Sequence, residues 1–105
     1  MSNEPFRLMV VDYVFQNRDC VSVFPGLPAR ELPRAVGVGD KVELRRPDGK
    51  QIATTIAGIE HAKKFDGSSA YPLRFPLSVC KEDVPLGTEV WWMAPKPTLG
   101  GILDA

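Results

Sequence analysis

The chain has 105 residues, of which 44% are hydrophobic and 25% are charged, and its thirteen basic side chains balance thirteen acidic ones. This size and composition are typical of one globular domain with a core of its own. A net charge of zero argues against binding to duplex DNA, which needs many phosphate contacts, and against attraction to an anionic membrane.

Ten prolines and nine glycines are scattered along the chain. Both residue types destabilise the interior of a helix, so their spread leaves little room for a long one. The composition therefore favours short strands that are joined by many turns.

The N-terminus and the cysteines bear on the cellular compartment. Residues 1–5 lack the basic start and the apolar run of a signal peptide, and apolar runs such as residues 8–11 are too short to span a membrane. Cys20 and Cys80 are far apart and have no second ligand motif nearby. We expect free thiols and a cytoplasmic protein; a disulfide would require an oxidising compartment.

Apolar and polar residues alternate with a period of two in several short segments, the pattern of half-buried strands. The segments are residues 6–15, 20–24, 41–45, 51–59, 71–79 and 89–93. The first is apolar on both faces and is interrupted by Asp12, as expected for a strand that curls through a closed or two-layer structure. We expect one domain over residues 6–93, a flexible lead over 1–5, a loop with at most one helical turn over 27–34 and an irregular tail over 94–105.

The segment from residue 36 to residue 60 predicts a hairpin. Val42 and Leu44 alternate with charged residues and are expected to face the core. Pro47-Asp48-Gly49 then supplies a three-residue turn, because proline presets φ at the first corner and glycine can take the left-handed position. The return segment is rich in Ile and Thr, which favour strands.

Residues 71–79 show the cleanest alternation, with an apolar residue at every second position from Tyr71 to Val79. Pro72 and Pro76 lie on the opposite face. Because proline cannot donate to a sheet ladder, this strand is expected at an edge or with a bulge. Six short strands at close spacing predict an all-β fold, a single six-stranded antiparallel β-barrel.

Four blocks of the sequence resemble the second domain of the elongation factor Tu family of translational GTPases, which is a six-stranded β-barrel. They are residues 5–15, 38–44, 56–60 and 81–90, in the family's order and spacing. They correspond to its opening strand, the start of a strand after a glycine and an acidic residue, a strand end before a variable loop, and the closing turn with the last strand. The resemblance covers residues 5–91.

The chain also departs from this family. The place of the family's glycine-rich segment between the first two strands reads Asn-Arg-Asp-Cys at residues 17–20, and residues 25–35 are longer and richer in proline. No Gly-x-x-x-x-Gly-Lys-Ser/Thr motif is present, so no phosphate cradle for GTP is expected. The GTPase activity of the family does not carry over.

In members of the family that carry tRNA, the loop after the block matching residues 56–60 contacts the acceptor end of aminoacyl-tRNA. The resemblance places Glu60 at the acidic residue of that pocket and Lys63 at a basic one, followed by Lys64 and Phe65. A carboxylate can accept from a base or ribose, a cation can meet phosphate, and an aromatic ring can stack. The alternative is an ordinary solvated loop.

A modest basic excess from Arg30 to Lys64 includes the hairpin over residues 41–50. It would extend an RNA-facing surface, or its interleaved charges would neutralise one another. His61 is the sole histidine, and no Ser-His-Asp or Cys-His spacing accompanies it. The two cysteines and the histidine show no ligand spacing either. We therefore expect no catalytic residue, no cofactor and no metal.

Trp91 and Trp92 are adjacent, so in a strand they point to opposite faces. One is expected to close the core, and the other to pack under the tail or to serve as a partner contact, since tryptophan is frequent at binding hot spots. The sequence predicts a non-enzymatic binding module, first of all an adaptor or inhibitor of a protein partner. The alternative is binding of tRNA or single-stranded RNA through the 60–65 loop and the 41–50 hairpin.

Overall fold

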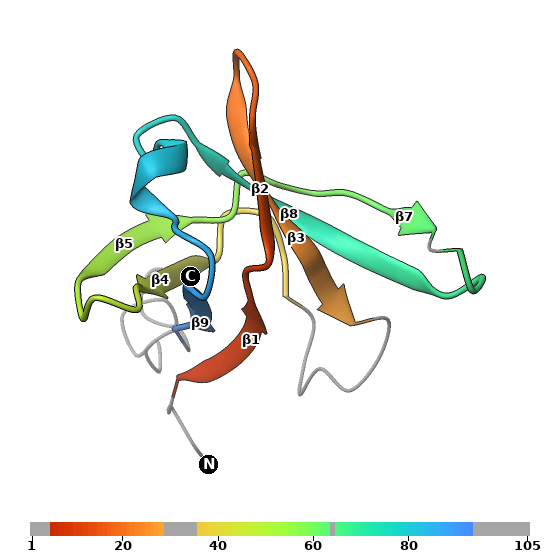
Figure 1. Ribbon diagram of the computed structural model, residues 1–105, viewed down its shortest axis with the longest axis horizontal. Coiled ribbons are helices and arrows are strands. Elements are labelled where there is room, and N and C mark those ends of the chain that lie inside the picture. Colours follow the sequence, from red (N-terminus) through yellow and green to blue (C-terminus); the bar gives the residue numbers. More distant parts are fainter. Residues whose placement is uncertain (1–4, 29–35, 64, 94–105) are drawn as a thin grey trace, which may run out of the picture.

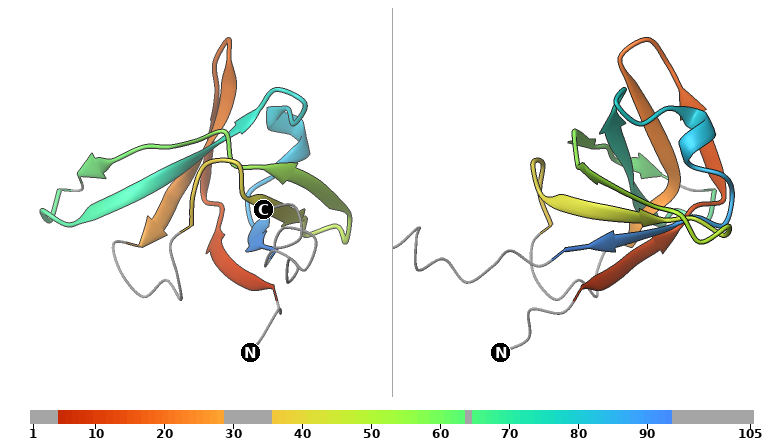
Figure 2. Two further views of the ribbon diagram at one scale, coloured as in Figure 1. Left: turned by 180° about the vertical axis from the view of Figure 1, so that it is seen from behind. Right: turned by 90° about the vertical axis from the view of Figure 1, so that its left-hand side faces the viewer.

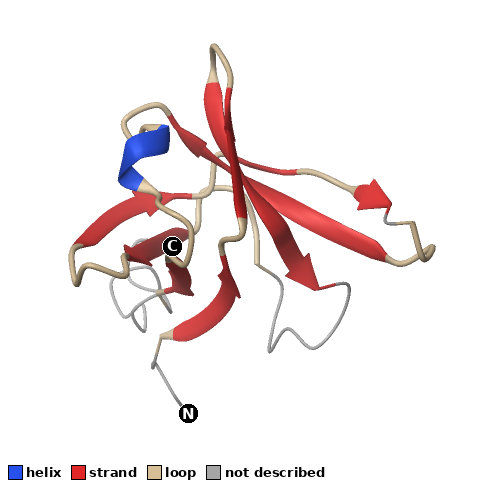
Figure 3. Ribbon diagram, viewed as in Figure 1, coloured by secondary structure: helices blue, strands red, loops and turns tan. Residues whose placement is uncertain are grey.

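The computed structural model describes residues 5–28, 36–63 and 65–93. Nine strands and one short 3-10 helix make up the described part (Figures 1 and 3). They are β1 (Phe6–Val10), β2 (Tyr13–Gln16), β3 (Cys20–Pro28), β4 (Lys41–Arg45), β5 (Gln51–Thr55), β6 (Gly58–Ile59), β7 (Ala62–Lys63), β8 (Ser69–Pro76), η1 (Lys81–Asp83) and β9 (Glu89–Trp92).

The strands form two antiparallel sheets. One sheet has the order β1-β9-β4-β5, and the other has the order β2-β3-β8-β6, with β7 also paired to β8. In the right-hand view of Figure 2, the red, blue and yellow strands of the first sheet lie below the orange and teal strands of the second. The all-β prediction is confirmed. The prediction of one closed six-stranded barrel is wrong, because the strands pair within two separate sheets.

The expected first strand breaks between Val11 and Asp12, which bond in different directions. The N–H of Val11 donates to the carbonyl of Thr88 at 2.8 Å, and its own carbonyl accepts from the N–H of Gly87 at 2.8 Å. The N–H of Asp12 instead donates to the carbonyl of Phe24 at 2.9 Å. The chain therefore passes from the first sheet to the second at this point, and β1 and β2 are separate strands.

The expected strand over residues 51–59 breaks in the same way after Ile56. The N–H of Ile56 donates to the carbonyl of Asp40 at 3.0 Å, beside the first sheet, whereas the N–H of Ala57 donates to the carbonyl of Arg74 at 2.7 Å in the second. These two crossings link the sheets. They turn the six expected segments into eight strands, and the ninth, β7, forms in residues that were expected to be a loop.

The core lies between the two sheets and is contributed by both of them. Its fully buried members include Val21 and Val23 from β3, Val42 and Leu44 from β4, Leu73 and Phe75 from β8, and Val90 from β9. The alternation predicted for β4 is confirmed, since Val42 and Leu44 are buried between more exposed neighbours. Burial of this apolar surface is the main favourable contribution to folding.

The predicted hairpin is present with its three-residue loop. The N–H of Arg46 donates to the carbonyl of Lys50 at 2.8 Å, and the N–H of Gly49 donates to the carbonyl of Arg46 at 3.0 Å. Gly49 has a φ of +91°, the left-handed conformation that glycine adopts without a steric cost. Every bond that closes this loop is local, so the sequence was sufficient to predict it.

β8, the strand with the prolines, lies between β3 and β6 and not at an edge, and the bulge opposite Pro72 belongs to its partner β3. Val23 pairs with Leu73 and Leu27 pairs with Tyr71, so the intervening residues of β3 stand opposite Pro72 alone. The strand ends at Pro76, earlier than expected, which leaves Leu77 exposed. On the other side, β3 continues to Pro28, so the first two residues of the expected 27–34 loop belong to a strand.

Candidate functional site

The loop expected to contact RNA forms one arm of the molecule, at the right of Figure 1. Glu60 is exposed, its N–H donates to the carbonyl of Pro72 at 2.9 Å, and its carboxylate lies 3.4 Å from Nε of Arg74. Lys63 is exposed in β7, and Phe65 is fully exposed in the turn before β8. The structure therefore pairs Glu60 with a cation of the protein itself, while Lys63 and Phe65 face solvent.

Lys64, Arg30 and the tail over residues 94–105 lie outside the described residues, and so does the lead over residues 1–4. The predictions that concern them stay predictions.

His61 lies on the same arm. Its Nε2 is 3.0 Å from the hydroxyl of Ser69, and its ring stacks on that of Tyr71 with 5.3 Å between the ring centroids. In the described residues no group of three or more His, Cys, Asp or Glu side chains could hold a metal ion. The surroundings of His61 are those of a stacked aromatic pair.

The two tryptophans face opposite sides of the first sheet, as predicted. Trp92 is buried, with 4% of its surface exposed, and its Nε1 donates to Oδ2 of Asp40 at 3.1 Å. Trp91 is half-buried, its Nε1 donates to Oε1 of Glu89 at 2.8 Å, and the guanidinium of Arg45 lies 4.2 Å from its ring centroid. Trp92 is therefore the tryptophan that closes the core, and Trp91 is the one that remains a candidate for a partner contact.

The outer face of the first sheet has charges that neutralise one another. Nε of Arg45 lies 2.6 Å from Oε1 of Glu43, and Nη1 of Arg7 lies 3.4 Å from Oε2 of Glu89. The pKa of Glu89 is below its ordinary range because Nε1 of Trp91 donates to it and the two arginines attract its charge. These pairs favour the interpretation of the 41–50 hairpin as self-neutralised.

Exposed apolar side chains gather instead around β2, an edge strand of the second sheet. Tyr13 and Phe15 are 57% and 50% exposed, and Leu86 is 63% exposed. Between β2 and residues 81–86 lies a groove of about 540 Å³, lined mainly by apolar atoms. Its lining residues are Tyr13, Val14, Lys81, Glu82, Val84, Pro85 and Leu86.

Residues 81–86 form the wall of this groove that faces β2, and hydrogen bonds fix the position of this wall at both ends. At one end the N–H of Lys81 donates to Oε1 of Gln16 at 2.7 Å. At the other end Val11 exchanges two main-chain hydrogen bonds with residues 87–88. The wall is thus fastened to the same stretch of chain that forms the opposite side, and the groove is preformed.

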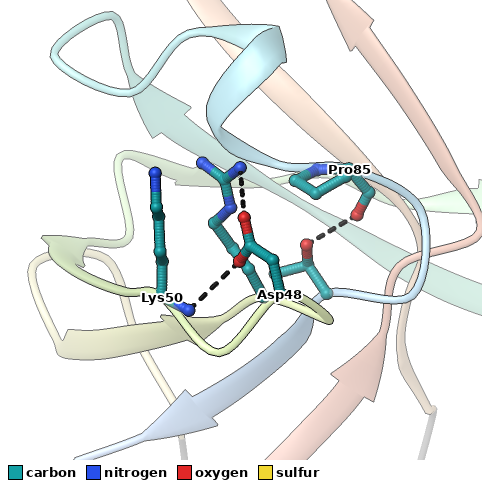
Figure 4. Close-up of polar contacts among 5 residues, drawn as sticks. Asp48, Lys50 and Pro85 are labelled. Atoms are coloured by element: carbon teal, nitrogen blue, oxygen red, sulfur yellow. Dashed lines mark hydrogen bonds and ion pairs between the residues drawn. The ribbon is translucent and has the colours of Figure 1, made fainter.

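The loop of the β4–β5 hairpin packs against the turn that follows this wall. Within the segment that follows, the hydroxyl of Thr88 donates to the carbonyl of Pro85 at 2.6 Å (Figure 4). A Cβ atom added at Gly87 would lie 3.2 Å from Cγ of Pro47, so the two turns are in contact. Thr88 is fully buried, and this hydrogen bond satisfies its hydroxyl.

One residue of β2 directs its main-chain groups into the groove. The N–H of Asn17 donates to the carbonyl of Cys20 at 3.0 Å, and Tyr13 pairs with Phe24 in the same ladder. In an antiparallel ladder the residues that bond to the partner strand alternate with residues that face away. Counting back from Asn17 in steps of two, Phe15 and Tyr13 are the residues that bond to β3. The N–H and C=O of Val14, which lies between them, therefore point away from β3.

The ladder between β3 and β8 independently indicates the same orientation for the main-chain groups of Val14. The carbonyls of Pro72 and Arg74 accept hydrogen bonds from residues 60 and 57, so the residues of β8 that bond to β3 are Leu73, opposite Val23, and Phe75, opposite Val21. The residues of β3 that bond to β2 are then those at positions 20, 22 and 24. No other described residue forms a main-chain hydrogen bond with the N–H or C=O of Val14 on the side away from β3.

This groove was not predicted from the sequence. The alternation Tyr-Val-Phe-Gln over residues 13–16 does contain a signal, because it places two aromatic rings on the face opposite buried Val14. The contribution of residues 81–86 has no signal at the sequence level, since it depends on contacts across 65 positions.

The described residues contain no helix that is long and apolar enough to cross a membrane. Both cysteines are free, with Cys20 buried and Cys80 exposed. Comparisons of this chain with protein-family models, with curated proteins and with solved structures found no match.

Proposed function

We propose that this protein is a non-enzymatic binding module whose partner is another protein, held at the groove between β2 and residues 81–86. The observation that carries this proposal is the set of exposed apolar side chains around a preformed groove at a sheet edge. Apolar surface gathered in one place marks interaction sites in soluble proteins. Free thiols fit a reducing compartment, so we place the protein and its partner in the cytoplasm.

Trp91 is a weaker candidate for the partner contact. Arg45 lies over its ring and its indole N–H is already bonded to Glu89. A partner that used Trp91 would have to displace these contacts. Tyr13 and Leu86, by contrast, are 57% and 63% exposed, and the ring of Tyr13 contacts only that of Phe24 among the described aromatic residues, at 5.6 Å between centroids.

Affinity capture from native lysate tests the proposal when it compares matched variants. Leu86 and Val38 are both exposed apolar residues, at 63% and 65%, but Val38 does not line the groove. We expect the wild type and Val38→Ser to retain one stoichiometric protein that Leu86→Ser and Tyr13→Ser both lose. Circular dichroism checks that each variant is folded. Equal capture by all four proteins would contradict the proposal.

A second candidate function is binding of tRNA or single-stranded RNA by the arm that carries β7. The resemblance to the second domain of translation factors supports it, and so does one observation, the exposure of Phe65 beside Lys63 and the stacked His61–Tyr71 pair. Aromatic rings next to a cation form the usual platform for unpaired bases. Glu60 is engaged by Arg74, so the expected role of its carboxylate would require that ion pair to open.

Fluorescence anisotropy with labelled tRNA and a single-stranded RNA tests this candidate. Binding should weaken as salt rises, because phosphate contacts release counterions. Lys63→Glu should weaken it further, whereas Arg18→Glu, in the turn between β2 and β3, should not. Absence of binding at low salt would remove RNA from consideration.

A further inference from the structure

We infer that the groove takes a short extended protein segment that inserts one large apolar side chain between Tyr13 and Leu86, carries basic residues beside it, and pairs its main chain with Val14. This inference rests on the proposed protein-binding function and specifies the ligand. Three features of the groove carry it: its apolar lining, its main-chain groups and its charge.

The apolar lining defines the central contact. Val84 and Pro85 form the wall opposite Tyr13, and Leu86 extends it toward solvent. The volume of about 540 Å³ lies within the roughly 300–1,000 Å³ of pockets that hold ligands. One large apolar side chain placed here would bury the exposed faces of Tyr13 and Leu86. Such central anchors supply most of the binding free energy at protein interfaces.

The main-chain groups define the conformation of the ligand. Val14 directs its N–H and C=O into the groove, and its side chain is buried, so the edge is rigid there. An extended segment can add to a free sheet edge through such groups. The bonds of Val11 to residues 87–88 and the bond of Lys81 to Gln16 close the groove at its two ends. The segment that pairs with this edge is therefore only a few residues long.

The charge around the groove defines the flanking residues. Glu82 lines it beside Lys81, and two further carboxylates adjoin the lining residues in the chain, Asp83 in η1 and Asp12 before β2. The pKa of Cys80, at the start of η1, lies above its ordinary value because of a hydrogen bond with Asp83, the charge of Asp83 and the charge of Glu82. Complementary charge favours a ligand with Lys or Arg, and an RNA backbone would be repelled.

A phage-displayed library of random eight-residue peptides, selected on the full-length protein, tests the inference. We expect the enriched peptides to share one large apolar residue flanked by Lys or Arg. Fluorescence anisotropy of the synthesised peptides then gives affinities for the variants. Leu86→Ala should weaken binding at least about tenfold, as for other central anchors. Enrichment of acidic peptides, or of none, would overturn the inference.

Two further measurements address the charge and the main chain. Glu82→Lys should weaken binding by roughly two- to tenfold, since one exposed pair is lost and a repulsive one replaces it. The matched control Glu60→Lys, remote from the groove, should leave it unchanged. Methylation of the peptide amides one at a time should abolish binding at the one position whose N–H pairs with the carbonyl of Val14; tolerance at every position would rule out this pairing.

Other occupants give different results, and each would overturn the inference. A second copy of the chain would appear as concentration-dependent dimerisation in sedimentation, with the peptide as a competitor. Single-stranded RNA would displace the peptide. If lysate capture still depends on Leu86 but no basic peptide binds, the proposed function stands and this ligand assignment fails. If neither depends on Leu86, both fail.

Discussion

Gly26 lies in the bulge of β3, where the chain passes closest to β8. Its φ is +98°, and a Cβ atom added there would lie 2.4 Å from main-chain atoms of Tyr71 and Pro72. No side-chain rotation can relieve a clash with main chain. The position therefore requires glycine both for its backbone conformation and for the space it leaves.

The comparison with Gly39 separates these two effects. Gly39 has a φ of +95° but would place a Cβ atom in open space. We expect Gly39→Ala to lower the free energy of unfolding by about 1–2 kcal/mol, the cost of a left-handed residue. Gly26→Ala should cost at least about twice that, because the clash adds to the same strain. Urea denaturation measures both; equal losses would contradict the packing argument.

The two tryptophans give a second contrast between adjacent residues. Replacement of buried Trp92 by Ala removes a large core side chain and leaves the carboxylate of Asp40 without its indole donor. We expect a loss of about 3–5 kcal/mol, typical for a buried aromatic residue. Trp91→Ala should cost clearly less, because Trp91 is half-buried on the outer face. Thermal or urea unfolding measures both variants, and a larger loss for Trp91→Ala would contradict the assignment of faces.

At the scale of elements, the β4–β5 hairpin is the part that local chemistry explains best. Asp48 binds both sides of its loop, with Oδ1 accepting from the N–H of Lys50 at 3.1 Å and Oδ2 from Arg46 at 2.9 Å (Figure 4). The pKa of Asp48 is below its ordinary value because of the Lys50 N–H, reinforced by the hydrogen bond and charge of Arg46. The loop thus stabilises the ionised carboxylate.

This shift has a consequence for stability at different pH values. A carboxyl group with a lower pKa in the folded state stabilises the fold above its unfolded-state pKa, and that stabilisation is lost as the pH falls through its folded-state pKa. We expect Asp48→Asn to lower the free energy of unfolding at pH 7. The difference from wild type should shrink between about pH 5 and pH 2. Urea denaturation across this range measures it, and a constant difference would argue against the carboxylate.

The two segments that cross between the sheets are the ones whose strands the local sequence pattern predicted incorrectly. Residues 6–15 were expected to form one strand because they are apolar on both faces, and residues 51–59 because alternation continues through Ile56. The break arises from the partner that each N–H finds, and these partners are up to 77 positions away, as in the bond from Val11 to Thr88. Burial alternates through Ile56 in the second segment, and the adjacent residues Leu8 and Met9 are both buried in the first, so neither sequence pattern reveals the crossing.

At the scale of the whole molecule, β3 and β8 form the centre of the second sheet. Their core residues Val21, Val23, Leu73 and Phe75 are completely buried. We expect the slowest hydrogen exchange at the amides of Val21 and Val23, since only global unfolding exposes the most buried strands. Amides of β7 should exchange much faster, because this short strand pairs on one side only. NMR-detected exchange measures the difference; equal protection would contradict this ranking.

The groove is also a property of the whole molecule. Its two walls come from β2 and from residues 81–86, and they are joined by contacts that span the chain. Tyr13, Phe15 and Leu86 are unremarkable as single residues of the sequence. They become a candidate site only when the segment before β9 returns to the edge of the second sheet.

The sequence by itself determined the all-β class, the Pro-Asp-Gly hairpin and the opposite faces of the tryptophans. Each of these follows from strand alternation or turn chemistry, which act over a few residues. Only the tertiary structure decided that there are two sheets, that Trp92 is the buried tryptophan, and that a groove opens beside β2. These outcomes depend on which distant segments share hydrogen bonds and core contacts, and a local pattern carries no information about that choice.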